Sequence, residues 1–128
     1  MKKDIQSKAD IKILIDSFYE KVKTDDTIGY LFTNVVHVDW EKHLPIMVNF
    51  WDNILFYTGN YRGQPMNLHH HLHQLSNLTL EHFARWNKLF DSTVDAHFEG
   101  ENAERAKQNA HSISTVMQLK ILNKHNPL

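Results

Sequence analysis

Cysteine is absent from this 128-residue chain, which removes several chemistries at once. Disulfides, thiolate metal sites and cysteine nucleophiles all require the thiol. Long apolar runs are equally scarce, and none approaches the roughly 18 residues that a membrane span needs. The charged start Met1-Lys2-Lys3-Asp4 is followed by no apolar segment of the kind found in signal peptides. We therefore expect a soluble, cytoplasmic protein that has no membrane partner.

An excess of charge of one sign is also missing. Fourteen Lys and Arg against fifteen Asp and Glu leave a formal net charge of -1. Proteins that bind nucleic acid or anionic membranes normally carry a basic excess or a basic patch. The composition therefore predicts neither of these partners. The length is typical of a single domain, residues 1–128, with one hydrophobic core.

Glycine and proline are few, at four and three residues, and the apolar residues recur mostly at spacings of three and four. This spacing places them on one face of an α-helix, and strand-like alternation is nowhere sustained. The pattern predicts an all-α fold. Helices are expected from the N-cap Ser7 to about residues 24–26, from Thr79 to Gly100, and from about Asn102 onward.

A helix in the middle of the chain contains a proline, which complicates the prediction of its start. Asp39 is a plausible N-cap for a helix that carries His43 and Met47 on its apolar face. Pro45 has no amide hydrogen, and proline is tolerated best in the first turn of a helix. The regular helix is therefore predicted to begin around Leu44.

Histidine is concentrated in one short segment, His69-His70-His71-Leu72-His73, which holds four of the ten histidines. Imidazole is the commonest protein ligand for transition metals. On a helical turn His69 and His73 share a face, so that the pair could hold a zinc ion. The glutamate of an HExxH zinc hydrolase is absent from this segment. A polar surface turn is the competing interpretation.

Three polar side chains occupy positions that an ordinary core would fill with aliphatic residues. Tyr19, His43 and Trp86 each lie on or near a helical stripe of Phe, Ile, Leu and Met. A buried hydroxyl, imidazole or indole N–H without a partner costs about 1–3 kcal/mol. A backbone carbonyl would satisfy any one of them in a plain core. Three donors directed into one cavity would instead suit a ligand that accepts hydrogen bonds in an apolar, water-excluded site.

Five short motifs occur in order along the chain. They are Phe18-Tyr19-Glu20-Lys21-Val22, Trp40-Glu41-Lys42-His43-Leu44-Pro45-Ile46-Met47, Asn49-Phe50-Trp51, Gly63-Gln64-Pro65-Met66 with His69 and Leu72 following, and Leu78-Thr79 with His82-Phe83 and Arg85-Trp86. In this order and spacing, the chain resembles the third group of bacterial truncated haemoglobins over nearly its whole length. The paired-glycine motifs typical of the other truncated groups are missing, as they are in the third group.

The resemblance implies a shortened globin fold, in which a two-over-two helical sandwich holds a non-covalent haem b. His69 matches the proximal ligand of the haem iron. Tyr19, His43 and Trp86 match the distal tyrosine, histidine and tryptophan. Other residues at positions that match contacts of the haem are Phe32, Met47, Phe50 and Leu72.

The resemblance also carries an expectation of function. One axial imidazole implies a pentacoordinate iron whose sixth position is open to O₂, NO or CO. Donors on Tyr19 and Trp86 would strengthen O₂ binding and slow its release, which argues against transport or storage. Chemistry on O₂ and NO is favoured, with nitric oxide dioxygenase or peroxidase-like activity and an unidentified reductase as partner.

Three alternatives stay open on the sequence alone. His73, one turn further on, is a second candidate for the iron ligand. His43 has three possible roles, which are contact with the ligand, gating of the pocket, and coordination of the iron itself. The competing class of protein is a non-haem helical metal-binding or interaction protein with a surface histidine cluster.

Overall fold

All regular elements in the described part of the chain are helices. The computed structural model describes residues 2–35, 39–57 and 78–125. In chain order the elements are α1 (Lys8–Thr24), the short π-helical turn η1 (Leu31–Val35), α2 (Trp40–Phe56), α4 (Leu80–His97) and α5 (Glu101–His125). The predicted all-α class is confirmed. None of these described helices is long and apolar enough to cross a membrane.

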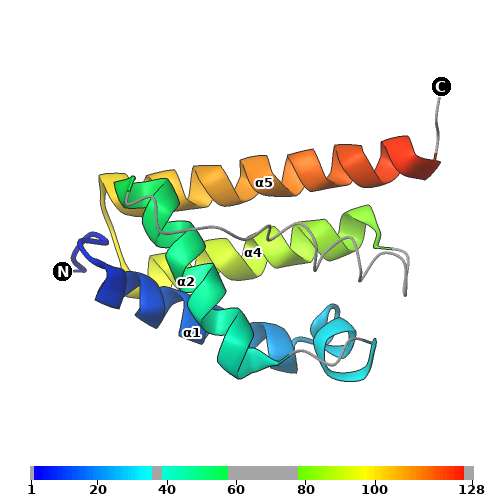
Figure 1. Ribbon diagram of the computed structural model, residues 1–128, viewed down its shortest axis with the longest axis horizontal. Coiled ribbons are helices and arrows are strands. Elements are labelled where there is room, and N and C mark those ends of the chain that lie inside the picture. The colour runs from blue at the N-terminus through cyan, green and yellow to red at the C-terminus, as the bar shows by residue number, and fades with distance from the viewer. Residues whose placement is uncertain (1, 36–38, 58–77, 126–128) are drawn as a thin grey trace.

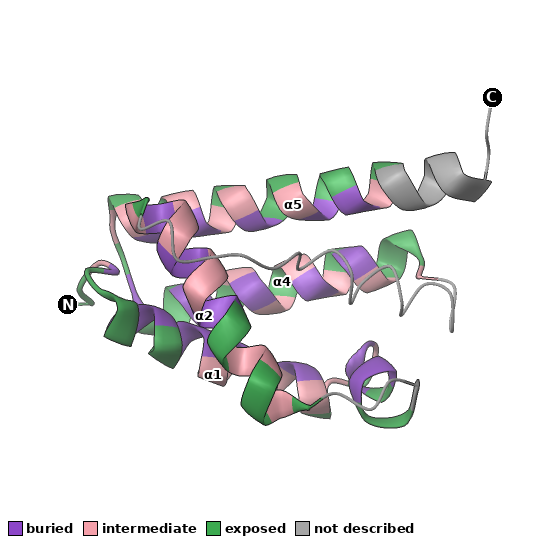
Figure 2. Ribbon diagram, viewed as in Figure 1, coloured by how far each residue is buried: buried purple, intermediate pink, exposed green. Residues whose placement is uncertain are grey.

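The helices pack as two pairs. α1 contacts α2, and α4 contacts α5, while α1 also packs on α4 and α2 on α5. In Figure 1, α4 and α5 run alongside each other in the long direction of the molecule, and α2 crosses in front of α1. Figure 2 shows that the buried residues, in purple, follow the sides of the helices that face the interior. The hydrophobic core therefore lies between the two pairs of helices.

Two helices begin at the residues that the sequence predicted. The Ser7 side chain accepts a hydrogen bond from the amide of Asp10 at 3.4 Å, and α1 follows it directly. At the start of α4, the Thr79 hydroxyl accepts from the amide of His82 at 3.3 Å, and His82 Nδ1 accepts from the amide of Thr79 at 3.1 Å. Such reciprocal caps satisfy amides that have no partner inside the helix.

The predicted start of the middle helix is wrong, because α2 begins one turn before Leu44 and contains Pro45 in its interior. The amide of His43 already donates to the carbonyl of Asp39 at 2.9 Å, so the helix is hydrogen-bonded ahead of the proline. The proline deprives only the carbonyl of Glu41 of its helical partner. Glu41 and Pro45 are both exposed, so water can satisfy that carbonyl and the cost of the proline is reduced.

Aromatic side chains fill the centre of the core. Phe18 of α1 and Phe90 of α4 are buried, with ring centroids 5.2 Å apart in an edge-to-face arrangement. Trp51 of α2 stacks on Phe90 at 5.0 Å, and Trp86 stacks on it at 5.8 Å. Aromatic pairs of this geometry contribute about 0.5–1.5 kcal/mol each beyond the area that they bury. Trp86 is therefore held inside the core by its neighbours.

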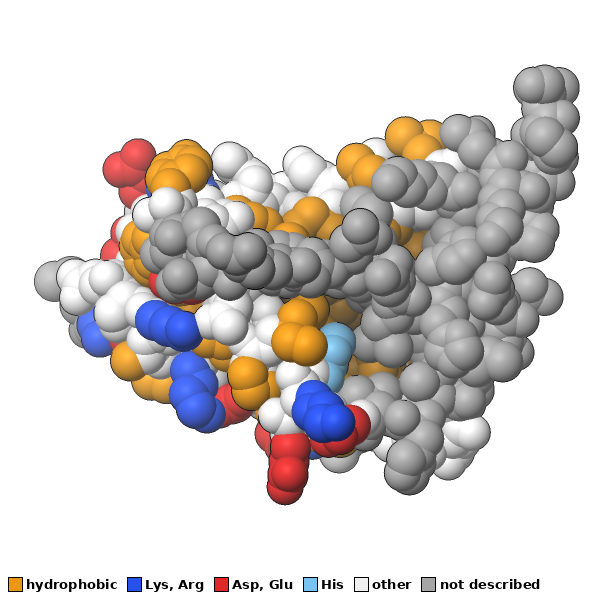
Figure 3. All heavy atoms as spheres, viewed as in Figure 1, with side chains coloured by type: hydrophobic (Ala, Val, Ile, Leu, Met, Phe, Trp, Pro, Cys, Tyr) orange, Lys and Arg blue, Asp and Glu red, His pale blue; other side chains and the backbone are white. Residues whose placement is uncertain are grey.

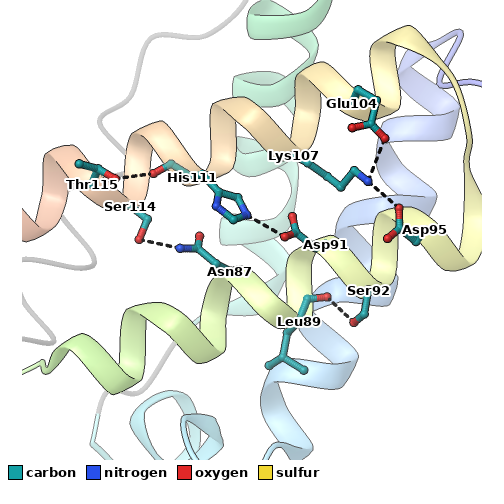
Figure 4. Close-up of polar contacts among 10 residues, drawn as sticks. All are labelled: Asn87, Leu89, Asp91, Ser92, Asp95, Glu104, Lys107, His111, Ser114 and Thr115. Atoms are coloured by element: carbon teal, nitrogen blue, oxygen red, sulfur yellow. Dashed lines mark hydrogen bonds and ion pairs between the residues drawn. The ribbon is translucent and has the colours of Figure 1, made fainter.

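Charged contacts join α4 to α5 along their outer sides (Figure 4). Lys107 of α5 pairs with Asp95 of α4 at 2.8 Å and with Glu104 of its own helix at 2.9 Å. His111 lies 2.7 Å from Asp91. The carboxylates of the Lys107 pairs are exposed, and exposed ion pairs contribute little to stability.

The segment before α1 closes one end of the helical sandwich. The Asp4 carboxylate accepts hydrogen bonds from the amides of Asn102 at 2.9 Å and Ala103 at 2.8 Å, in the first turn of α5. Ile5, the next residue, is completely buried. Gly100 has φ +142, and a Cβ there would come within 2.5 Å of the Asp4 Cγ atom. The close approach of Asp4 to α5 therefore requires glycine at position 100.

Replacing Asp4 tests the importance of this contact. Asp4→Ala should lower the free energy of unfolding by about 1–2 kcal/mol, because the first turn of α5 loses a charged cap. The matched control is Asp16→Ala, which removes an exposed pair with Lys12 of the same helix and should cost no more than about 0.5 kcal/mol. Urea denaturation of both variants measures the difference, and equal losses would contradict the capping role.

Candidate functional site

A hollow opens between the two helix pairs; it has about 380 Å³ of empty space when open solvent is included, and about 20 Å³ that admits the centre of a water molecule. Four residues that the sequence singled out line it: Tyr19 from α1, Met47 and Phe50 from α2, and Trp86 from α4. The remaining lining residues are Ile15, Phe18, Trp51, Ile113 and Met117. Figure 3 shows apolar side chains reaching the surface in the middle of the face on which α2 lies. The hollow is thus walled by aromatic and aliphatic groups, as ligand pockets usually are.

A second, smaller hollow of about 290 Å³ lies next to the first. Phe32 and Trp86 are among its walls, and Trp86 belongs to both hollows. The Phe32 ring is also 6.4 Å from the ring of Tyr19. Phe32 therefore lies beside the residues of the first hollow, and the indole of Trp86 is the wall common to both. The other residues around the smaller hollow are Ile28, Leu31, Leu78, His82 and Phe83.

Tyr19 lies on the inner face of α1 and is only 4% exposed. Its ring contacts those of Trp40 at 5.1 Å and His43 at 5.5 Å. Burial raises the pKa of the Tyr19 phenol well above its ordinary value of 10.0. The side chain, which lines the apolar hollow, thus carries a hydroxyl that stays protonated over an even wider pH range than an exposed tyrosine.

His43 reaches the same region from the first part of α2. Its ring packs edge-on against Tyr19 at 5.5 Å and against Trp40 at 5.8 Å. Its Nε2 atom is buried and has no hydrogen-bond partner among the described residues. Burial lowers the pKa of His43 below 6.5, which favours the neutral imidazole. A buried nitrogen left in this way costs free energy, and such atoms commonly mark the place of a ligand, ion or water.

The predicted residues of the opposite wall lie outside the described residues. These are His69 and Leu72, together with the alternative iron ligand His73. Among residues 2–35, 39–57 and 78–125, no group of three or more His, Asp or Glu side chains is placed to hold a metal ion. The described part of the chain therefore supplies one wall of the pocket. The assignment of the iron ligand stays a prediction.

Some features of the site and its surroundings could not be assigned from the sequence. Phe18 and Trp51 belong to the motifs that carried the resemblance, but only the packing of the helices makes them walls of the hollow. The ion pair between Asp25 and Arg85 joins residues 60 positions apart, which no local pattern reveals. Met117 of α5 also lines the hollow, and its place there follows from the packing of α5 on the other helices.

The helical architecture and the aromatic hollow between paired helices define an all-α, globin-like protein. The chain is 31% identical over 121 residues to the group 3 truncated haemoglobin of Campylobacter jejuni, covering 92% of this chain and 93% of that protein. It matches the crystal structure of the group III truncated haemoglobin from Campylobacter jejuni with a TM-score of 0.79 and 30% identity, over 94% of this chain and 95% of that one. No protein-family model matches the chain.

The chain therefore belongs to the group 3 truncated haemoglobins, and the resemblance seen in its motifs is confirmed. The family implies a haem cofactor. The lining of the hollow suits such a group in its chemistry, since aromatic and aliphatic side chains match a flat hydrophobic ring system. The buried Nε2 of His43 and the protonated hydroxyl of Tyr19 place polar groups on the same side of the site.

The burial of neutral His43 predicts a specific pH dependence. Above pH 6.5 the imidazole is uncharged in both states, whereas below it the unfolded chain takes up the proton first. The free energy of unfolding should therefore fall as the pH drops below 6.5, and His43→Leu should show a smaller fall. Urea denaturation of the apoprotein at about pH 7.5 and about pH 5.5 checks this. An identical fall in both proteins would show that His43 is not buried as a neutral group.

Proposed function

We propose that this chain binds haem b with His69 as the axial ligand, and that it binds O₂, NO and CO at a pentacoordinate iron. The observation that carries the proposal is the gathering of Tyr19, Met47, Phe50 and Trp86 around one hollow, in a member of the group 3 truncated haemoglobins. When bound, the haem supplies an iron centre that takes up diatomic ligands and exchanges electrons.

The residues of the described wall supply hydrogen-bond donors in an apolar surrounding. The Tyr19 phenol is protonated at neutral pH, and burial raises its pKa further above the ordinary value of 10.0. The indole N–H of Trp86 can only donate. Both side chains are held in place by ring contacts, with Phe18 lying 5.0 Å from Tyr19 and 5.5 Å from Trp86. Donors fixed in this way need no reorganisation when a ligand arrives.

These donors favour retention of O₂. A hydrogen bond to a ligand that carries partial negative charge contributes about 1–3 kcal/mol, and 1.4 kcal/mol corresponds to a factor of ten in an equilibrium constant. Slow release is unsuited to transport or storage. We therefore assign the protein to chemistry on O₂ and NO or to their detoxification, such as conversion of NO to nitrate or the handling of peroxide.

A reductase partner follows from this proposal, since turnover requires the iron to be returned to its ferrous state. His43 is placed to serve the same pocket through its contact with Tyr19. Its three roles, in contacting the ligand, in gating and in binding the iron, differ in their optical spectra. A ferrous spectrum that is six-coordinate without added ligand, and five-coordinate in His43→Ala, would assign it to the iron.

Removing either donor should speed the release of O₂. Tyr19→Phe and Trp86→Phe should each raise the dissociation rate constant of O₂ by about tenfold or more, because each loses one charge-assisted hydrogen bond. Tyr57→Phe is the control, because Tyr57 is 81% exposed and lies outside both hollows. Stopped-flow displacement of O₂ by CO measures the rates. Unchanged rates in both site variants would remove the basis for tight O₂ binding.

The axial ligand is tested by comparing two histidines of the same short segment. His69→Ala should abolish the Soret absorbance of the reconstituted protein or sharply weaken its retention of haem, because the iron loses its protein ligand. His73→Ala should retain both. The reverse result would assign the iron to His73, and retention of the Soret band in both variants would show that neither histidine is the required ligand.

A further inference from the structure

We infer that Arg85 is a positioning residue for Trp86, and that it acts through its ion pair with Asp25. The effect of this positioning on O₂ release rests on the proposed function, whereas the positioning itself is a property of the folded chain. Arg85 lines neither hollow, whereas Trp86, the next residue, lines both.

The Asp25 carboxylate is fully engaged. Its Oδ1 atom accepts a hydrogen bond from Nε of Arg85 at 2.8 Å and lies 2.6 Å from Nη2 in the ion pair. Its Oδ2 atom accepts from the amides of Thr27 at 3.0 Å and Ile28 at 3.1 Å. The Asp25 side chain is 3% exposed, and the hydrogen bond from Arg85 holds its pKa below the ordinary value. Loss of the guanidinium would leave a buried carboxylate without its counter-charge.

This contact fixes the rotation of α4 about its own axis. Successive residues of an α-helix point about 100° apart, so anchoring Arg85 to the end of α1 sets the direction in which Trp86 projects. Asp25 is also the residue at which α1 ends, and it holds the turn that leads to η1 and Phe32. The pair therefore controls the spacing between the indole and the segment that carries Phe32, which both line the smaller hollow.

A second polar contact joins the same two segments one turn earlier in α4. His82 Nδ1 accepts from the amide of Thr79, so Nε2 carries the proton and donates to the Tyr30 hydroxyl at 3.2 Å. His82 precedes Trp86 by one helical turn and Arg85 precedes it by one residue. The Arg85 contact differs from this one in carrying full charges and in having one well-buried partner, since the Asp25 side chain is 3% exposed and the Arg85 side chain 35%.

The chain offers a matched control for a lost ion pair. Lys107 of α5 pairs with Asp95 of α4 and with Glu104 of its own helix (Figure 4), and it lines neither hollow. Lys107→Gln and Arg85→Gln each remove one paired cation. If Arg85 had only a general structural role, the two substitutions would have similar effects on the surroundings of Trp86. Arg85→Lys keeps the charge and loses the planar donor geometry.

The first readout needs no haem. In apoprotein labelled with 5-fluorotryptophan, the ¹⁹F resonance of Trp86 is assigned by its loss in Trp86→Phe. Arg85→Gln should shift or broaden this resonance, Arg85→Lys should do so less, and Lys107→Gln should leave it unchanged. An unchanged resonance in Arg85→Gln, or an equal change in Lys107→Gln, would overturn the positioning role. Because haem is absent, this outcome is independent of the proposed function.

The second readout is the O₂ dissociation rate constant of the haem-loaded protein. Arg85→Gln should raise it about threefold or more, and the same substitution should have no further effect when Trp86 is already Phe. The effect should persist when Tyr19 is Phe. An equal increase with and without the indole would show that Arg85 does not act through Trp86. A shifted fluorine resonance in a protein that binds no haem would keep the positioning role and refute the proposed function.

Discussion

The packing of α1 against α4 is the contact on which the site depends. Phe18 of α1 lies edge-to-face with both Trp86 and Phe90 of α4, at 5.5 Å and 5.2 Å. These contacts bring the Tyr19 position and the indole to the same hollow. α2 then covers the hollow with Met47, and its early residues bring the imidazole of His43 beside the phenol. Without this contact the polar groups of the described wall would not share a surface.

The polar groups are placed where they oppose stability. Burial raises the pKa of Tyr19 and lowers the pKa of His43, and the Nε2 atom of His43 has no hydrogen-bond partner among the described residues. A core selected only for stability would place aliphatic residues at such positions. Tyr19 lines the apolar hollow and His43 packs against its ring, which is the physical reason to regard this wall as a binding surface. Membership of the group 3 truncated haemoglobins implies a haem cofactor, and such a surface suits that group.

Local patterns predicted much of the fold, because helix caps and apolar stripes are encoded within a few residues. Ser7 and Thr79 mark helix starts that the structure reproduces. The prediction at Pro45 was wrong because the free-energy cost of a proline inside a helix depends on whether the carbonyl four residues earlier can reach water. That exposure is decided only by the folded chain. Tyr19 and Trp86 could be singled out by their position on apolar stripes. The contact of Arg85 with Asp25 could not, since it depends on how α4 docks on α1. The roles of His69 and Leu72 remain predictions, because both lie outside the described residues.

The optical spectrum of the purified or haem-reconstituted protein, reduced and then exposed to CO and O₂, tests the assignment of this chain to haem chemistry most directly. Our interpretation predicts a Soret band that moves on reduction and moves again with each gas, together with slow loss of O₂. A protein that shows no such band after reconstitution with haem, and that instead binds nickel or zinc, would contradict it.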